Sequence, residues 1–184
     1  MTRYFAAASL AVLLAAAPAA AKDFKLTSPD VANRKTITEP FLYKGFGCEG
    51  GNTSPALSWK GAPAETKSFA VSVYDPDAPT GSGWWHWVVY NLPATTTTLA
   101  RGVGDASGSQ LPAGSIQART DFGTTGYGGP CPPPGAKPHR YVFTVHALKV
   151  DVLPIPVDAS PAMVGFMVRL NSLDKVSLTA RYGR

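Results

Sequence analysis

Residues 69–91 read FAVSVYDPDAPTGSGWWHWVVYN and combine two apolar runs with a turn rich in proline and glycine. The apolar runs at the two ends predict strands that pair across the turn. Asp75, Asp77 and His86 then lie where the strands meet the turn, among several aromatic rings. A solvated turn has no need of so much aromatic surface beside its charges. The stretch therefore predicts a pocket.

The rest of the chain repeats this pattern of short apolar runs separated by turns. The 184 residues include 18 glycines and 17 prolines, which fall between the runs and do not form one tract. Such punctuation is typical of an all-β sandwich or barrel-like core. From Tyr141 to Ala147, every second residue shares one strand face, which we expect to be buried. His146 lies on the opposite face and is expected to be a surface or packing residue.

One helix is predicted near the C-terminus. Ser160 suits the N-cap, and Pro161 suits the first helical position. Apolar residues then recur near a 3.6-residue period, and helix propensity continues to about Asp174. The segment Lys175–Tyr182 fits either a last helical turn or a strand.

The N-terminal segment has the pattern of a secretory signal peptide. Arg3 is followed by a short run rich in Ala and Leu, and Ala19–Ala21 offers a small-residue cleavage site. The run is too short for a transmembrane anchor, and no later segment reaches the ~20 apolar residues that span a bilayer. We therefore expect residues 1–21 to be a signal peptide cleaved near Ala21. Residues 22–184 then form a single periplasmic or secreted domain.

Export changes the interpretation of the two cysteines, Cys48 and Cys131. In an oxidising compartment an even pair favours a disulfide over a catalytic thiol or a metal site. Both cysteines lie in loops rich in glycine and proline, where the sequence does not define the geometry, so the bridge stays open at this point.

Charge and motif spacing argue against several function classes. The formal net charge is +5, but the basic residues are scattered and lack the clustered footprint of nucleic-acid binding. No tight pair of ligands such as His-x-x-x-His is present, and the sequence predicts neither a metal nor a cofactor.

The candidate site residues fall in three separate segments. In the first two, Asp75 and Asp77 point the same way on an extended backbone, and a carboxylate that fixes the tautomer of His86 would leave its other ring nitrogen facing a ligand. In the third, the loop 126–134 contains glycines whose backbone N–H groups, at Gly128 and Gly129, are expected to form a nest-like anion site.

Taken together, these segments resemble one protein family. The motifs are DPDAP at 75–79, WWHW at 84–87, GYGGPCPP at 126–133 and HRY at 139–141, with GCEGGNTSPALSW earlier, at 47–59. In this order they are similar to the phosphatidylethanolamine-binding protein family, and most of all to its bacterial branch, often labelled Raf kinase inhibitor-like. The resemblance runs from about Phe24 to Arg184.

The resemblance implies a mainly β fold, a β-sandwich of antiparallel sheets with a few short helices, one of them near the C-terminus. It also implies an anion pocket near the surface. The ligand-binding residues carried over from the family pattern are Asp75, Asp77, His86, Tyr127, Gly129, Pro130, His139 and Tyr141.

The function expected from these features is that of an exported module that binds phosphate, phosphoryl head groups or similar anions without catalysis and regulates a partner protein. Two alternatives stay open. One is a hydrolase that uses His86 with Asp75 as its orienting group, although no Gly-x-Ser-x-Gly elbow is present. The other is a protein-interaction or inhibitor module with no small ligand. The sequence names no partner protein and does not decide between a monomer and a homodimer.

Overall fold

The structure, a computed structural model, describes residues 23–156 and 158–184. The predicted signal peptide, residues 1–21, lies outside the described residues. Within the described ranges, no helix is long and apolar enough to cross a membrane. The elements along the chain are β1 (Lys25–Thr27), the 3₁₀ helix η1 (Glu39–Phe41), β2 (Lys44–Gly45), β3 (Cys48–Glu49), β4 (Leu57–Lys60), β5 (Ser68–Asp75), β6 (Trp84–Pro93), β7 (Thr98–Leu99), β8 (Ile116–Gln117), β9 (His139–Leu148), α1 (Pro161–Asn171) and β10 (Ser172–Tyr182).

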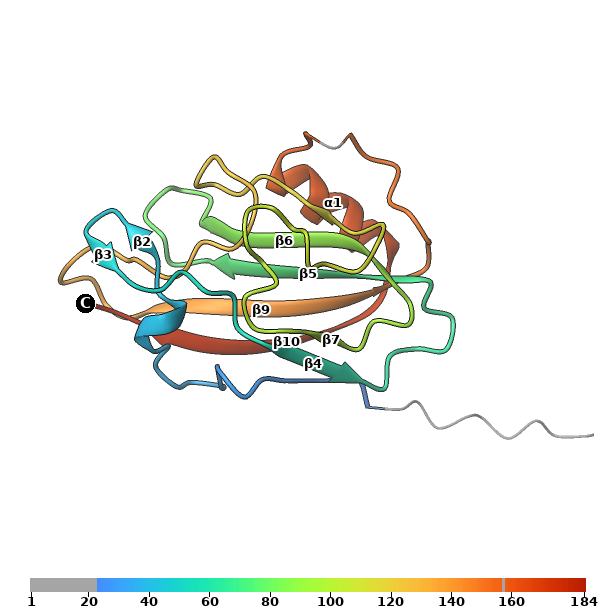
Figure 1. The fold of residues 1–184 in the computed structure, drawn as a ribbon, viewed down its shortest axis with the longest axis horizontal. Coiled ribbons are helices and arrows are strands. Elements are labelled where there is room, and N and C mark those ends of the chain that lie inside the picture. The colour runs from blue at the N-terminus through green and yellow to red at the C-terminus, as the bar shows by residue number, and fades with distance from the viewer. Residues whose placement is uncertain (1–22, 157) are drawn as a thin grey trace, which may run out of the picture.

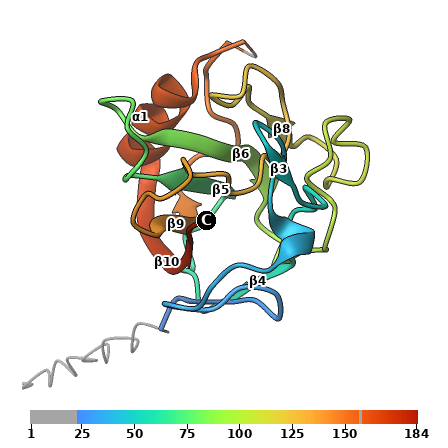
Figure 2. The ribbon, with the colours of Figure 1, turned by 90° about the vertical axis from the view of Figure 1, so that its left-hand side faces the viewer.

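The strands form two facing antiparallel sheets and one small hairpin, which confirms the predicted β-sandwich (Figure 1). The larger sheet has the strand order β10-β9-β5-β6-β8, and the smaller one has the order β1-β4-β7. β2 and β3 form the hairpin. The main apolar cluster joins residues of both sheets, and α1 covers the other face of the larger sheet (Figure 2).

β5 is the central strand because its side chains are apolar on both faces. Val71 and Val73 pack into the cluster between the sheets, whereas Ala70 packs into the cluster beneath α1. The strand pairs with β6 on one side and with β9 on the other, always antiparallel. The predicted pairing across the turn at Asp75 is therefore confirmed, and its register places Asp75 opposite Trp84.

β9 confirms the predicted alternation of buried and less buried residues. Tyr141, Phe143, Val145 and Ala147 are all buried. His146 lies on the opposite face, where its Nδ1 is 2.9 Å from the hydroxyl oxygen of Ser172. This histidine therefore acts as a packing residue beside α1.

The predicted helix exists but ends earlier than expected. The Ser160 hydroxyl accepts a hydrogen bond from the N–H of Met163, and Pro161 occupies the first turn, as predicted. The helix ends at Asn171 and not near Asp174, because Ser172 already pairs with β9 as the first residue of β10. An eleven-residue antiparallel strand offers more partners than another helical turn, so Lys175–Tyr182 is a strand.

A disulfide joins Cys48 to Cys131. The bond ties the β2–β3 hairpin to the proline-rich loop that precedes β9, two segments separated by 83 residues in the sequence. It therefore settles the question that the sequence left open.

Removing this disulfide is expected to destabilise the fold substantially. Closing a loop of 83 residues restricts the unfolded chain, and the chain-entropy model values this at about 4 kcal/mol. The Cys48→Ser, Cys131→Ser double variant should lose about that much free energy of unfolding in urea titrations. Wild-type protein under reducing conditions should lose the same amount. An unchanged unfolding midpoint in both experiments would contradict this assignment.

Candidate functional site

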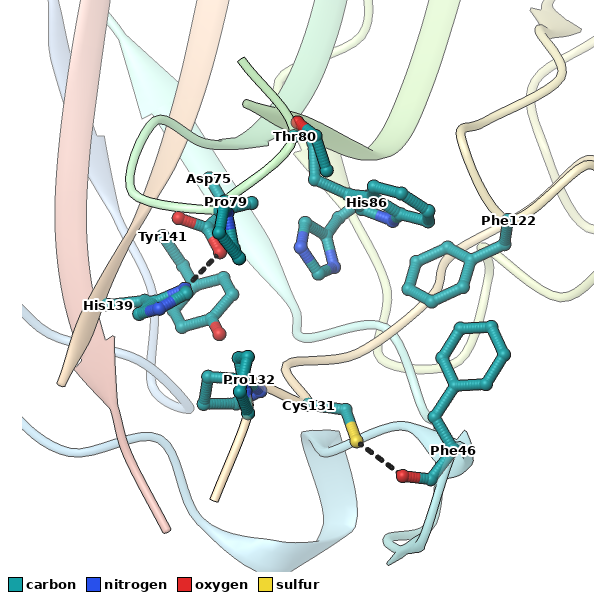
Figure 3. Close-up of a pocket in the computed structure, with 13 residues that line it drawn as sticks. Phe46, Asp75, Pro79, Thr80, His86, Phe122, Cys131, Pro132, His139 and Tyr141 are labelled. Atoms are coloured by element: carbon teal, nitrogen blue, oxygen red, sulfur yellow. Dashed lines mark hydrogen bonds and ion pairs between the residues drawn. The ribbon is translucent and has the colours of Figure 1, made fainter. Parts of the chain in front are cut away.

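The antiparallel arrangement of three strands gathers the candidate side chains at one edge of the larger sheet. Asp75 is the last residue of β5, and the beginnings of β6 and β9 lie beside that end. His86 enters from β6, and His139 and Tyr141 enter from β9. They surround a hollow of about 170 Å³ (Figure 3).

The hollow, called the anion pocket below after the ligand expected from the sequence, is mostly apolar with a few converging polar groups. The hairpin tip, the turn after β5 and the disulfide loop complete its walls. Its lining residues are Phe46, Asp75, Ala78, Pro79, Thr80, Trp84, His86, Phe122, Cys131, Pro132, Pro133, His139 and Tyr141. Four of the eight predicted ligand-binding residues line it, namely Asp75, His86, His139 and Tyr141.

His86 is held as a neutral imidazole with a known tautomer. Its Nδ1 lies 2.6 Å from the carbonyl oxygen of Gly128, and a carbonyl can only accept, so Nδ1 carries the proton. Nε2 is then an unprotonated acceptor. Burial lowers the pKa of His86 to about 4, because the charged ring would lose its water.

Asp75 orients His139 and not His86, which corrects the pairing predicted for the hydrolase alternative. Its Oδ2 lies 2.7 Å from Nδ1 of His139, and its Oδ1 accepts the backbone N–H of Asp77 at 2.8 Å. Both Asp75 and His139 are buried. The reason is local. The carboxylate of Asp75, at the end of β5, is directed toward His139 in β9. At Nδ1 of His86, the carbonyl of Gly128 takes the place predicted for a carboxylate.

Two buried donors in the wall of the anion pocket have no hydrogen-bond partner within the described residues. They are the hydroxyl of Tyr141, a side chain only 1% exposed, and the indole N–H of Trp84. Figure 3 shows the hydroxyl directed toward Pro132, which also lines the pocket. Burial raises the pKa of Tyr141, so the phenol keeps its proton. A buried donor left unpaired costs free energy, which a ligand that accepts from it recovers.

The glycine loop does not form the predicted anion nest. The N–H of Gly128 donates to the backbone oxygen of His86, and that of Gly129 donates to Oδ1 of Asn52 at 2.8 Å. The glycines are needed for close packing instead. A Cβ would lie 2.3 Å from the ring of Phe122 at Gly128 and 2.3 Å from the backbone oxygen of Phe41 at Gly129.

The other predicted residues of this loop support the wall from behind. Tyr127 is buried, and its hydroxyl donates to the carbonyl oxygen of Phe41 at 2.8 Å. The carbonyl of Pro130 accepts the N–H of Tyr43. The structure therefore places Tyr127, Gly129 and Pro130 outside the residues that line the pocket.

Asp77 also lies outside the anion pocket. Its carboxylate forms a bidentate ion pair with Arg140. Nη2 of Arg140 lies 2.6 Å from Oδ1 of Asp77, and Nε lies 2.9 Å from Oδ2. Hydrogen bonds from Arg140 hold the pKa of Asp77 below its usual value. The side chain lines a neighbouring groove together with Arg140.

Sequence reasoning misses the aromatic rim. Phe46, at the tip of the β2–β3 hairpin, is 68% exposed, and its ring centroid lies 6.0 Å from that of Phe122. Its backbone is left-handed, with φ of 52°, between two glycines that also have positive φ. A large apolar residue in such a Gly-Phe-Gly turn was the available signal, since strain of this kind concentrates at functional sites.

The pocket offers few groups for covalent catalysis. Cys131 is part of the disulfide and has no thiol, and the Thr80 hydroxyl donates to the carbonyl of Gly83. Within the described part of the chain, no group of three or more His, Cys, Asp or Glu is placed to hold a metal ion.

Acid should destabilise the protein through His86. Its pKa falls from 6.5 to about 4 on folding, so the unfolded chain binds the proton more tightly. Stability is therefore full above about pH 6.5 and is lost as the pH falls toward 4, by about 3 kcal/mol from this group. His86→Asn keeps a donor near Gly128 but cannot titrate, so its unfolding free energy should depend less on pH.

The comparison is made by urea unfolding at several pH values. The pKa of His146 is also lowered to about 4 by burial, so the variant should keep part of the slope. Identical pH slopes for the wild type and His86→Asn would contradict the assignment of a neutral, buried His86.

Comparison with known proteins gives one consistent relationship. A family model described as phosphatidylethanolamine-binding protein matches residues 27–183. The protein YbcL of Escherichia coli (strain K12) is 51% identical over 173 residues, which cover 94% of this chain and 93% of YbcL. YbhB of the same organism is 51% identical over 158 residues, which cover 86% of this chain and 99% of YbhB.

The fold agrees with these sequence matches. The crystal structure of Escherichia coli YbcL, described as a new member of the mammalian PEBP family, superimposes with a TM-score of 0.86 at 51% identity. The match covers 88% of this chain and 99% of that one.

Proposed function

The chain belongs to the phosphatidylethanolamine-binding protein family, in the branch of YbcL and YbhB, and from that premise we propose that it is an exported module that binds a phosphoryl group in the anion pocket without catalytic turnover. One observation carries the proposal. The Tyr141 hydroxyl is buried in the pocket wall with no partner among the described residues. An oxygen-rich ligand supplies the acceptor that this hydroxyl needs.

The polar groups suit an oxyanion that brings a proton. Tyr141 and Trp84 offer two donors, while Nε2 of neutral His86 offers an acceptor. A phosphate or phosphomonoester that keeps one proton can donate it to Nε2 and accept from the other two groups. His86 then becomes part of a charge-assisted hydrogen bond, which is among the stronger kinds.

The charge of the pocket makes binding depend on this proton. No lysine or arginine is among the described residues that line the pocket, and both oxygens of Asp75 are already engaged. The aromatic rings exclude water and strengthen the electrostatic interactions inside. Anion binding therefore depends, in this proposal, on the proton that the ligand shares with Nε2 of His86.

The size of the pocket limits what enters it. A volume of about 170 Å³ accommodates a phosphoryl group and a few further atoms, so the rest of a larger ligand must extend over the rim. The proposed ligand is therefore a small phosphorylated compound or the phosphorylated end of a larger one.

Export is part of the same proposal. The N-terminal pattern is typical of a signal peptide, and the Cys48–Cys131 disulfide is the kind of bond that persists in an oxidising compartment.

The Tyr141 hydroxyl provides the most direct test. Tyr141→Phe removes no hydrogen bond within the described protein, so its thermal stability without ligand should stay near that of the wild type. Its affinity for inorganic phosphate, measured by calorimetry, should fall about 10- to 100-fold, because a hydrogen bond to a charged group is lost.

Tyr90→Phe is the matched control. Tyr90 is also buried with an unpartnered hydroxyl, but it packs beneath α1, away from the pocket. This variant should bind phosphate like the wild type. Equal affinities of the wild type, Tyr141→Phe and Tyr90→Phe would rule out the proposed role of the pocket.

A further inference from the structure

A second hollow adjoins the anion pocket and has a different character. It is an open groove of about 540 Å³, and it shares Pro79, Pro133 and His139 with the pocket. His139 thus stands on the boundary, with the pocket on one side and the groove on the other. The remaining residues that line the groove are Asp77, Ala136, Lys137, Pro138, Arg140 and Arg181.

The groove has more positive than negative charge. Lys137, Arg140 and Arg181 face a single carboxylate, that of Asp77. Asp77 is fully engaged by the side chain and the backbone N–H of Arg140. Neither Lys137 nor Arg181 forms an ion pair with any described residue. Two cationic side chains therefore remain uncompensated beside the anion pocket.

The strand register places two of these positive charges opposite each other, which costs stability. Arg181 in β10 lies directly opposite Arg140 in β9. Like charges opposite each other destabilise an antiparallel pair, and Asp77 relieves only one of the two. An anion bound in the groove would relieve the other.

We propose that the ligand is a soluble phosphomonoester with a second anionic group, an inference that rests on the proposed function. The phosphoryl group lies in the anion pocket, and a carboxylate or second phosphate lies in the groove against Lys137 and Arg181. The two groups are joined by a short linker that passes His139, where pocket and groove meet.

The chemistry of His86 selects a monoester over a diester. Nε2 accepts a hydrogen bond, and a phosphomonoester, whose second pKa is near 6, can carry the proton for it around neutral pH. A phosphodiester has no such proton to give. The groove also selects against a ligand whose second group is an ammonium, because that group would meet Lys137 and Arg181 without a free carboxylate.

The test compares two ligands of nearly equal size that differ in one charge. Glycerol 3-phosphate carries a hydroxymethyl group where 3-phosphoglycerate carries a carboxylate. Calorimetry on the wild type should give about tenfold tighter binding of 3-phosphoglycerate, from two exposed ion pairs. Fructose 6-phosphate and fructose 1,6-bisphosphate form a second pair with a longer linker. Phosphorylethanolamine should bind no more tightly than glycerol 3-phosphate.

The groove is tested by the Lys137→Gln, Arg181→Gln double variant. It should bind glycerol 3-phosphate like the wild type but lose the preference for the second anion in both pairs of ligands. The control is Lys60→Gln, Lys149→Gln, which removes the same charge from two exposed residues that line neither hollow. This control should keep the preference.

The outcomes separate the two proposals. If none of the phosphorylated probes binds the wild type, the proposed function itself is wrong. If glycerol 3-phosphate binds but neither pair shows a preference, the groove takes no second anion and the further inference is overturned. The further inference is equally overturned if the groove variant and the control variant lose the preference to the same extent.

Discussion

The reciprocal hydrogen bonds between His86 and Gly128 are the constraint on which the site depends. Nδ1 of His86 donates to the backbone oxygen of Gly128, and the N–H of Gly128 donates back to the backbone oxygen of His86. This pair fastens the glycine loop to β6 and fixes the tautomer of a fully buried ring. The same burial lowers the pKa of His86 to about 4. Because Nδ1 carries the proton, Nε2 is left as an acceptor.

The charges around the site follow a simple division. Among the described residues that line the anion pocket, Asp75 is the one Asp, Glu, Lys or Arg, and it is already bonded to His139. Lysine and arginine line the adjoining groove instead, where Lys137 and Arg181 have no carboxylate partner among the described residues. In the proposed function, the pocket recognises an oxyanion through its proton and its oxygen lone pairs, whereas the groove recognises charge alone. A ligand that satisfies both needs a protonated phosphoryl group and a second negative group.

Local patterns predicted the strands well and the hydrogen bonds poorly. The segments that form β5 and β6 are recognisable as apolar runs on either side of a turn, and β9 by its period-2 alternation. Both signals depend only on neighbouring residues. The family-like motifs also predict that His86, His139 and Tyr141 share one site. The partner of each polar group depends instead on long-range packing. The side-chain oxygen of Asn52, for example, accepts the N–H of Gly129, although the two residues are 77 positions apart in the sequence.

The same reason explains the other corrections. Asp77 turns to Arg140, 63 residues away, and the register between β10 and β9 ends α1 at Asn171. Phe46 lies at the pocket rim because the Cys48–Cys131 disulfide ties its hairpin to the proline-rich loop that precedes β9. None of these contacts produces a periodic pattern in the sequence from which it could be predicted.

The central claim, that the pocket binds an oxyanion through a proton held at His86, is tested most directly by nitrogen NMR of the imidazole rings. The chain has only three histidines, so His139→Asn and His146→Asn variants suffice to assign the His86 signals. Without ligand at about pH 7, Nδ1 should be protonated and Nε2 should show the shift of an unprotonated nitrogen. Saturating phosphate should move the Nε2 signal strongly toward the protonated, hydrogen-bonded range and leave Nδ1 nearly unchanged. A His86 spectrum that phosphate does not alter, in protein shown by calorimetry to bind it, would contradict the claim.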